Sequence, residues 1–226
     1  MTETHAIQKG RISFPKFKIY EFPDSSCNYE HPRGGICVLV KLDKMYLIKS
    51  VKLLMTDFME TTFANGLKMV NLYIPPVDSV YYDEQYVQLL CSEFWDSDND
   101  ESPMIAMGDT NTRLGDLTEI NKNYNYNQNP DKMMNENGKY LRRILCNATT
   151  AIPVNHMVKE GKVFDGGFTF ERNEKKSQID WCFGNKASLP EIKNFAVSRE
   201  CPKKVSDHLP IITVVNIDAT FIVERG

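Results

Sequence analysis

The sequence lacks the long apolar runs and leader patterns of membrane and secreted proteins. Its longest apolar runs, ICVLV at 36–40 and LPIITVV at 209–215, are too short to cross a bilayer. The first ten residues, MTETHAIQKG, do not combine a basic start with an apolar stretch, so we expect no secretory signal. These absences predict an intracellular protein, nuclear or cytoplasmic, without a membrane partner.

Cysteine is present, but without the spacing of a disulfide framework or a zinc site. The six cysteines are scattered, none forms a CxxC pair, and several lie in apolar runs. The four histidines never stand at zinc-finger spacing from a cysteine. We therefore expect reduced thiols in the core and no structural zinc.

The chain also lacks a strong net charge. Its 226 residues are 42% hydrophobic and 25% charged, with a formal net charge of −3, which suits one compact domain over residues 1–226. The charge is uneven, because residues 83–119 carry ten acidic and one basic side chain and residues 171–204 carry eight basic and five acidic ones. The acidic run is typical of a solvated loop, and the basic segment could help to hold a polyanion.

Short runs rich in β-branched and aromatic residues predict a strand-rich domain. The predicted strands are 36–41, 46–54, 68–74, 104–108, 179–184, 194–198 and 210–217. Apolar residues at helical spacing predict helices over 83–95 and 137–149, and the Asn-rich stretch 121–130 is predicted to be a surface loop. Strands with a few intervening helices favour an α/β sandwich over a regular βαβ alternation.

Three polar clusters stand at the ends of predicted strands. They are Gly108-Asp109-Thr110-Asn111, Ser177-Gln178-Ile179-Asp180 and Ser206-Asp207-His208-Leu209-Pro210. By chance, a G-D-x-N pattern is expected in about one of 30 chains of this length, and S-D-H-x-P in about one of 700. The first cluster alone is typical of a turn after a strand. The order of all three makes the set specific.

This set of clusters resembles the endonuclease/exonuclease/phosphatase superfamily, which has the DNase I-like fold. The likeness extends along nearly the whole chain. Its further segments are TETH (2–5), RGGICVLVK (33–41), NLYIPP (71–76), NENGKYL (135–141) and FTFERNEKKSQIDWCF (168–183). Within the superfamily, these segments are most similar to the endonuclease domains of LINE-type (non-LTR) retrotransposons.

The resemblance implies a fold, an activity and a partner. The fold is a four-layer α/β sandwich of two packed, mainly antiparallel sheets flanked by helices. The activity is magnesium-dependent hydrolysis of phosphodiesters, with manganese as an alternative ion, and the partner is DNA. The retrotransposon likeness implies a nicking endonuclease, with a reverse transcriptase as a candidate partner in a longer polyprotein.

The resemblance also assigns roles to individual residues. The implied metal ligands are Glu3 and Asp207. The implied catalytic residues are Asp109, Asn111, Asp180 and His208, and the implied substrate contacts are Tyr73, Thr169, Ser177 and Ser206. These residue types suit the reaction, because phosphodiester hydrolysis needs a positioned water and neutralised phosphate oxygens.

The spacing of these residues suggests how they act. Asp109 and Asn111 stand two apart, so on an extended segment their side chains point the same way. One can hold or deprotonate the attacking water while the other donates to a phosphate oxygen. Pairing of His208 with Asp180 would fix its tautomer and raise its pKa. His208 then either stabilises the pentacovalent phosphorane as a cation or acts as general base.

The sequence departs from the family at its start. The resemblance implies a first strand with a catalytic Asn, a first helix and most of the strand that leads into Glu3, and none of these precedes Glu3 here. A misassigned start codon, a decayed retroelement fragment and an adapted fold would each explain the departure. We expect a domain that is incomplete at its N-terminus.

Two alternative functions stay open. One is an apurinic-site or exonuclease III-like repair nuclease, and the other is a catalytically dead remnant that acts at most as a binding module. A phosphatase acting on inositol phosphates is disfavoured, because Met107 precedes the first cluster where that branch usually has Trp.

Overall fold

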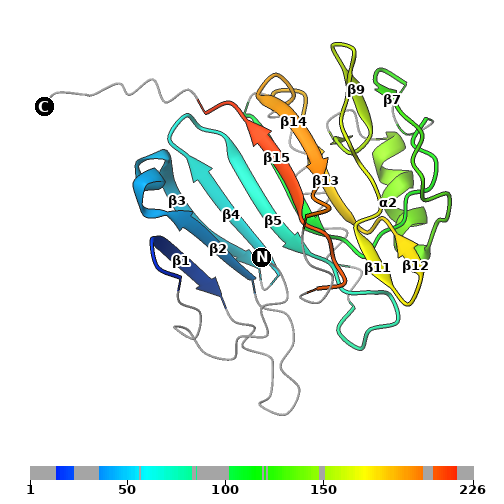
Figure 1. Ribbon diagram of the computed structural model, residues 1–226, viewed down its shortest axis with the longest axis horizontal. Helices are drawn as coiled ribbons and strands as arrows, with labels where there is room; N and C mark the ends of the chain where they lie inside the picture. The colour runs from blue at the N-terminus through cyan, green and yellow to red at the C-terminus, as the bar shows by residue number, and fades with distance from the viewer. Residues whose placement is uncertain are drawn as a thin grey trace, which may run out of the picture.

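The described helices and strands are mainly β-strands (Figure 1). The structure is a computed structural model that describes residues 14–22, 36–55, 57–82, 85, 102–118, 120, 122–147, 151–200 and 206–217. Its strands are β1 (Phe17–Phe22), β2 (Ile36–Lys41), β3 (Ile48–Met55), β4 (Phe58–Phe63), β5 (Lys68–Tyr73), β6 (Met104–Asp109), β7 (Asn125–Tyr126), β8 (Ile152–Pro153), β9 (Met157–Lys159), β10 (Lys162–Val163), β11 (Phe170–Arg172), β12 (Lys175–Ser177), β13 (Asp180–Gly184), β14 (Ile192–Val197) and β15 (Ile211–Val215). Its helices are the 3-10 helix η1 (Leu42–Leu47) and α2 (Glu136–Asn147). None of the described helices has the length and apolar character to cross a membrane.

Six strands form the central sheet, in the order β3-β4-β5-β6-β13-β8. Strands β5 and β6 run parallel, and the other neighbours run antiparallel. In this register Asp109, the last residue of β6, lies opposite Tyr73 of β5 on one side and Asp180 of β13 on the other. Strand pairing therefore brings three predicted site residues to one end of the sheet.

Alternating side chains give the central sheet two apolar faces. On β13, Trp181 and Phe183 pack into a cluster that includes Leu145 of α2. Cys182, between them, packs into a second cluster with Phe195 of β14. Because successive side chains of a strand point to opposite faces, one fully buried strand serves both clusters.

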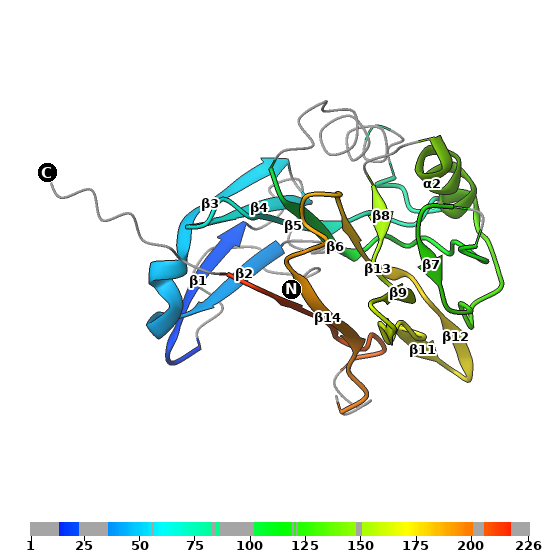
Figure 2. The ribbon, with the colours of Figure 1, turned by 90° about the horizontal axis from the view of Figure 1, so that it is seen from above.

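The molecule is layered around this sheet. The two-stranded sheets β1-β2 and β14-β15 lie on one side of it, and α2 lies on the other (Figure 2). The hairpin of β11 and β12 stands at the end of the sheet where β6 and β13 carry Asp109 and Asp180. This arrangement is the layered α/β sandwich that the sequence predicts.

Most predicted elements are confirmed, with bounds that shift by one or two residues. The predicted strand 46–54, for example, begins at Ile48 because η1 occupies the residues before it. The helix predicted over 83–95 lies outside the described residues except for Gln85. The prediction missed β1, β4 and the strands between β6 and β13. The strands between β6 and β13 have only two or three residues each, too few to form a recognisable alternating pattern.

The Asn-rich stretch 121–130 is more than the predicted surface loop. Its residues Asn125 and Tyr126 form β7, which pairs with β9. Asn129 is buried, and its Nδ2 donates to the carbonyl of Gly115 at 2.7 Å. The stretch is therefore anchored to the loop that follows β6.

The three described cysteines are reduced thiols. Cys37 and Cys182 are buried, as predicted for core thiols, whereas Cys146 is exposed, so that prediction is wrong for it. Burial raises the pKa of the Cys182 thiol to about 12, which makes it a poor nucleophile.

Candidate active site

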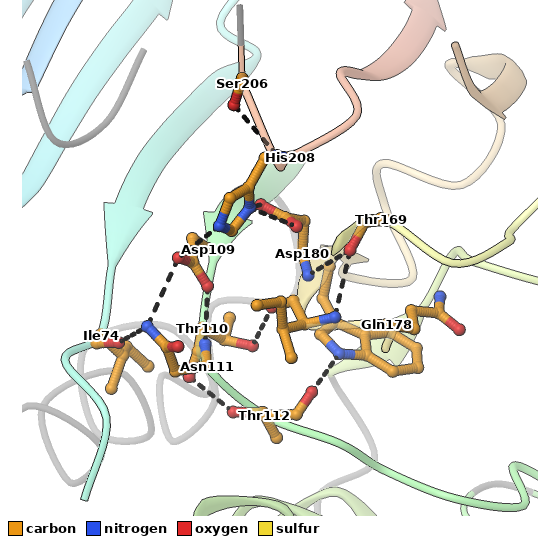
Figure 3. A network of polar contacts seen from close by, with 12 residues as sticks. Ile74, Asp109, Thr110, Asn111, Thr112, Thr169, Gln178, Asp180, Ser206 and His208 are labelled. Atoms are coloured by element: carbon orange, nitrogen blue, oxygen red, sulfur yellow. Dashed lines mark hydrogen bonds and ion pairs between the residues drawn. The ribbon is translucent and has the colours of Figure 1, made fainter. Parts of the chain in front are cut away.

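The first cluster ends β6 in a tight turn. Asn111 has a φ of +48°, and its backbone N–H donates to Oδ1 of Asp109 at 2.9 Å. The Asp109 carboxylate thus closes a turn of the kind that Asp favours. The prediction that this segment is extended is therefore wrong. A turn, rather than strand alternation, brings Asp109 and Asn111 together (Figure 3).

The glycine of this cluster is required by close packing. Gly108 has a φ of +152°, and a Cβ at this position would lie 1.9 Å from the carbonyl oxygen of Leu72 on β5. Only glycine lets β6 approach β5 this closely. The G-D-x-N pattern therefore combines a backbone requirement with a polar one.

The amide of Asn111 is held in place on both sides. Its Nδ2 donates to the carbonyl of Ile74 at 2.9 Å and to Oδ2 of Asp109 at 3.4 Å. The second distance is long for a hydrogen bond. Asn111 therefore orients the Asp109 carboxylate and keeps one weakly engaged hydrogen for another acceptor.

His208 is paired with Asp180, the contact that would raise its pKa. Its Nδ1 lies 3.0 Å from Oδ2 and 3.2 Å from Oδ1 of Asp180. Because a carboxylate only accepts, Nδ1 carries the hydrogen. Nε2 then faces Oδ2 of Asp109 at 3.9 Å (Figure 3). The ring of Phe170 packs edge-on against the imidazole, with centroids 5.1 Å apart.

The charges around His208 make it a cation at neutral pH. Burial alone would lower the pKa of His208. The hydrogen bond to Asp180 and the charges of Asp180, Asp109 and Asp207 outweigh burial and raise the pKa to about 9. The site therefore combines a buried carboxylate with a cationic imidazole.

Two fully buried threonines hold the strand ends that carry these groups. Thr169 Oγ1 accepts the backbone N–H groups of Ile179 at 3.1 Å and Asp180 at 3.0 Å. Thr110 donates from its N–H and its hydroxyl to the carbonyl of Ile179, both at 3.0 Å. The hydroxyl of Thr169, a predicted substrate contact, is thus hydrogen-bonded to the backbone, and the residue is fully buried behind the site.

A pocket of about 630 Å³ opens in front of the site. Asp109, Asn111 and His208 line it, together with two predicted substrate contacts, Tyr73 and Ser177. The structure thus brings catalytic and substrate-contact candidates into one concave surface, as expected for a ligand site.

A second pocket of about 510 Å³ reaches Asp109, Asp180 and His208 from another side. Ser206 lines this pocket, and its Oγ accepts the backbone N–H of His208 at 3.0 Å. Asp207 is exposed beside it, and its carbonyl accepts the N–H of Glu171 at 2.8 Å. Glu3, the other predicted metal ligand, lies outside the described residues.

Asp109, Asp180 and His208 are the one group of three or more potential ligand side chains found among the described residues. One ligand atom from each lies within 4.8 Å of the others. Carboxylate oxygens suit a hard cation such as magnesium. A protonated imidazole does not coordinate metals, and His208 is already bonded to Asp180. Only the carboxylates of Asp109 and Asp180 could therefore hold a divalent cation, and both are already engaged, by the Asn111 N–H and by His208.

Sequence reasoning missed the polar side chains behind the site. Asn135 Oδ1 accepts the N–H of Gly138 at 2.9 Å at the start of α2 and the N–H of Arg113 at 3.0 Å. Asn135 Nδ2 donates to the carbonyl of Asn111 at 2.8 Å. An Asn before a helix is a signal for a cap, so Asn135 could have been found. The ion pair of Arg113 with Asp131 joins residues far apart in sequence and leaves no local pattern.

Comparison with known proteins gives likeness in structure only. No family model matches the sequence, and no curated protein matches it significantly. An AP endonuclease from Archaeoglobus fulgidus matches with a TM-score of 0.64 and 16% identity, over 96% of this chain and 87% of that one. The 3′ phosphatase NExo from Neisseria, bound to product DNA hairpin, matches with a TM-score of 0.63 and 15% identity, over 95% and 87%.

A retrotransposon protein also matches. The endonuclease domain of TRAS1, a telomere-specific non-LTR retrotransposon, has a TM-score of 0.55 and 14% identity, over 89% of this chain and 81% of that one. These matched proteins are DNase I-like. The protein therefore has the DNase I-like fold, as its sequence motifs predict.

Proposed function

We propose that this protein is a divalent-metal-dependent phosphodiesterase that nicks DNA. The observation that carries the proposal is the cationic His208, which Asp180 holds facing Asp109 in a pocket at the end of the central sheet. A buried carboxylate beside a fixed cation suits a reaction in which a water attacks a phosphate whose oxygens gain charge.

Each residue then has a role that its contacts support. Asp109 accepts a hydrogen from the attacking water and orients it, because the Asn111 N–H fixes the carboxylate. His208 donates from Nε2 to a non-bridging phosphate oxygen. With a pKa of about 9 it carries that proton at neutral pH, so the stabilising role is favoured over the general base. Asn111 offers its second amide hydrogen to the phosphate.

The metal site belongs to the same proposal. Asp207, with Glu3 from outside the described residues, would hold a magnesium or manganese ion, which supplies positive charge to the phosphate oxygens when bound. Asp207 is exposed beside His208, where a cation and a phosphate could both reach it.

Charge near the pocket supports a nucleic-acid substrate. The hairpin of β11 and β12 begins at Phe170, which packs against His208, and ends at Ser177, which lines the pocket. Between them it carries three exposed basic residues, Arg172, Lys175 and Lys176, against two acidic ones, Glu171, which pairs with Lys176 at 3.4 Å, and Glu174. Such basic residues contribute salt-dependent affinity for phosphates. The retrotransposon type rests on the sequence motifs and is in keeping with the match to TRAS1.

A repair nuclease specific for apurinic sites is the second candidate. The specific observation in its favour is the TM-score of 0.64 with the archaeal AP endonuclease, against 0.55 with the retrotransposon domain. The two candidates share the site and differ in the DNA that they select.

The test is cleavage by the purified, folded protein on two substrates, supercoiled plasmid and an oligonucleotide duplex with one apurinic site. We expect plasmid nicking in magnesium, none in EDTA, and none with Asp109→Ala or His208→Ala. The variant Glu60→Gln, on β4, serves as control. Cleavage of the apurinic duplex alone would favour the repair nuclease. Absence of cleavage on both substrates would contradict the proposal and leave a binding module.

A further inference from the structure

We propose that Asp131 is a positioning residue that holds the two halves of the active site together. The inference rests on the proposed function. One half is the turn Asp109–Asn111 after β6, and the other is Asp180 at the start of β13. Asp131 lies in the loop between β7 and α2 and lines neither pocket of the site. It acts through its contacts with both halves.

The carboxylate of Asp131 is buried and fully occupied. Its side chain is 2% exposed. Oδ2 accepts from Nε of Arg113 at 2.9 Å and from the backbone N–H of Gln178 at 2.9 Å. Oδ1 accepts from Nη2 of Arg113 at 2.6 Å and from the N–H of Met133 at 3.1 Å. Four donors converge on one carboxylate, which offsets the cost of burying its charge.

The first contact fixes the loop after β6. Arg113 stands two residues after Asn111, and its guanidinium meets Asp131 through two parallel bonds, the geometry that a planar fork makes best. The N–H of Arg113 also donates to Asn135, whose amide holds the carbonyl of Asn111. The position of Arg113 therefore sets the turn that aims Asn111 and Asp109.

The second contact fixes the approach to β13. Gln178 stands two residues before Asp180, and its backbone N–H meets Asp131. Its side chain is also anchored, because Oε1 lies 2.9 Å from Nε2 of the buried His156. The next residue, Ile179, gives its carbonyl to Thr110 of the first half. Asp131 thus joins the segments that carry Asp109 and Asp180 beneath the site.

A carboxylate is needed for this arrangement. Each oxygen of Asp131 accepts one hydrogen from Arg113 and one from a backbone N–H, so the amide nitrogen of an Asn at position 131 would face two donors, and two bonds would be replaced by repulsion. The two halves would then move relative to each other. A displacement of about 1 Å at a catalytic site can cost about 100-fold in rate. The effect should fall on turnover, because Asp131 does not line the surface that binds substrate.

The test compares Asp131→Asn and Arg113→Lys with a matched control. Arg113→Lys keeps the charge and loses the fork. The control, Glu60→Gln, removes another buried carboxylate, which is paired with Lys52 at 3.0 Å on the edge of the central sheet away from both pockets. The readouts are hydrogen–deuterium exchange, which needs no activity, and plasmid nicking with kcat and KM measured separately.

We expect Asp131→Asn to speed exchange in both 109–113 and 177–180, and to lower kcat about 10- to 100-fold with KM within about 2-fold of wild type. Arg113→Lys should lower kcat less, and the control should change neither. Faster exchange in only one segment, or unchanged kcat in an active enzyme, would overturn the inference. An inactive wild type would refute the proposed function, and exchange would still decide whether Asp131 joins the two segments.

Discussion

His156 and His208 each pair with a residue near the start of β13, but the pKa values of the two imidazoles shift in opposite directions. His156 is 3% exposed, and its Nε2 lies 2.9 Å from Oε1 of Gln178. Burial lowers the pKa of His156, and the bond to Gln178 offsets this only in part. His208 is half-buried against Asp180, and its pKa is raised to about 9. One histidine is neutral and the other is cationic at neutral pH.

The hydrogen-bond partner, rather than burial, decides the charge of each imidazole. Burial favours the neutral form of both imidazoles. A carboxamide cannot outweigh it, whereas a carboxylate with two further acidic groups can. The two partners, Gln178 and Asp180, stand two residues apart. The same short segment therefore supplies a structural histidine and a candidate catalytic one.

The largest expected effect separates the two histidines by activity. We expect His208→Ala to reduce plasmid nicking about 100- to 10,000-fold, because it removes the cation beside Asp109. His156→Asn should keep nicking within about 10-fold of wild type, because Asn accepts the positive φ of +64° at this position. Initial nicking rates in magnesium would measure both. Equal losses in the two variants would contradict the distinction.

The next prediction removes the carboxylate partner. Asp180→Asn should lower kcat about 100-fold and bring the pKa of His208 down from about 9 toward 6.5, because the hydrogen bond and charge that raise it are lost. Nuclear magnetic resonance titration of the imidazole would measure the pKa. A pKa that stays near 9 in this variant would show that Asp180 does not set the charge of His208.

A partner exchange at His156 should produce the opposite shift. Gln178→Glu gives the buried imidazole a carboxylate, so the pKa of His156 should rise above its wild-type value. The position can accept the change, because Nε2 of Gln178 has no hydrogen-bond partner among the described residues. The same titration would detect it. If the pKa of His156 falls further, burial rather than the partner dominates there.

The smallest effect is on stability against pH. The raised pKa of His208 gives stability that is complete below pH 6.5 and is lost as pH rises from 6.5 through about 9. The lowered pKa of His156 gives stability that is present above pH 6.5 and is lost as pH falls below it. Thermal melting from pH 5 to 10 would show both limbs. His208→Gln should flatten the alkaline limb alone, and His156→Asn the acidic limb alone.

The sequence predicts the site residues at the strand ends, but it does not predict the hydrogen bonds that position them. Asp109 follows a short apolar run, and Asp180 and His208 each stand just before one, so their motifs predicted that they lie at strand ends, and the fold brings them together at one end of the sheet. The turn that replaces the expected extended segment depends on the side chain of Asp109 accepting a backbone N–H. Motif spacing alone does not specify this bond.

Polar pairs between residues far apart in the chain have no pattern in the sequence that would predict them. Asp131 meets Arg113 across 18 residues, and His156 meets Gln178 across 22. Each pair forms because the packed sheet brings two loops together, and no periodicity records that packing. His156 in particular has no neighbour in sequence that distinguishes it from an ordinary loop histidine. Its role became visible only with the fold.

The rate of single-turnover plasmid nicking as a function of pH reports the protonation state in which His208 acts. We expect a rate in magnesium that stays high through neutral pH and falls as pH approaches about 9, where the His208 imidazole loses its proton. A rate that is absent, or that rises with an inflection near pH 6.5 as a neutral general base would require, would contradict this expectation.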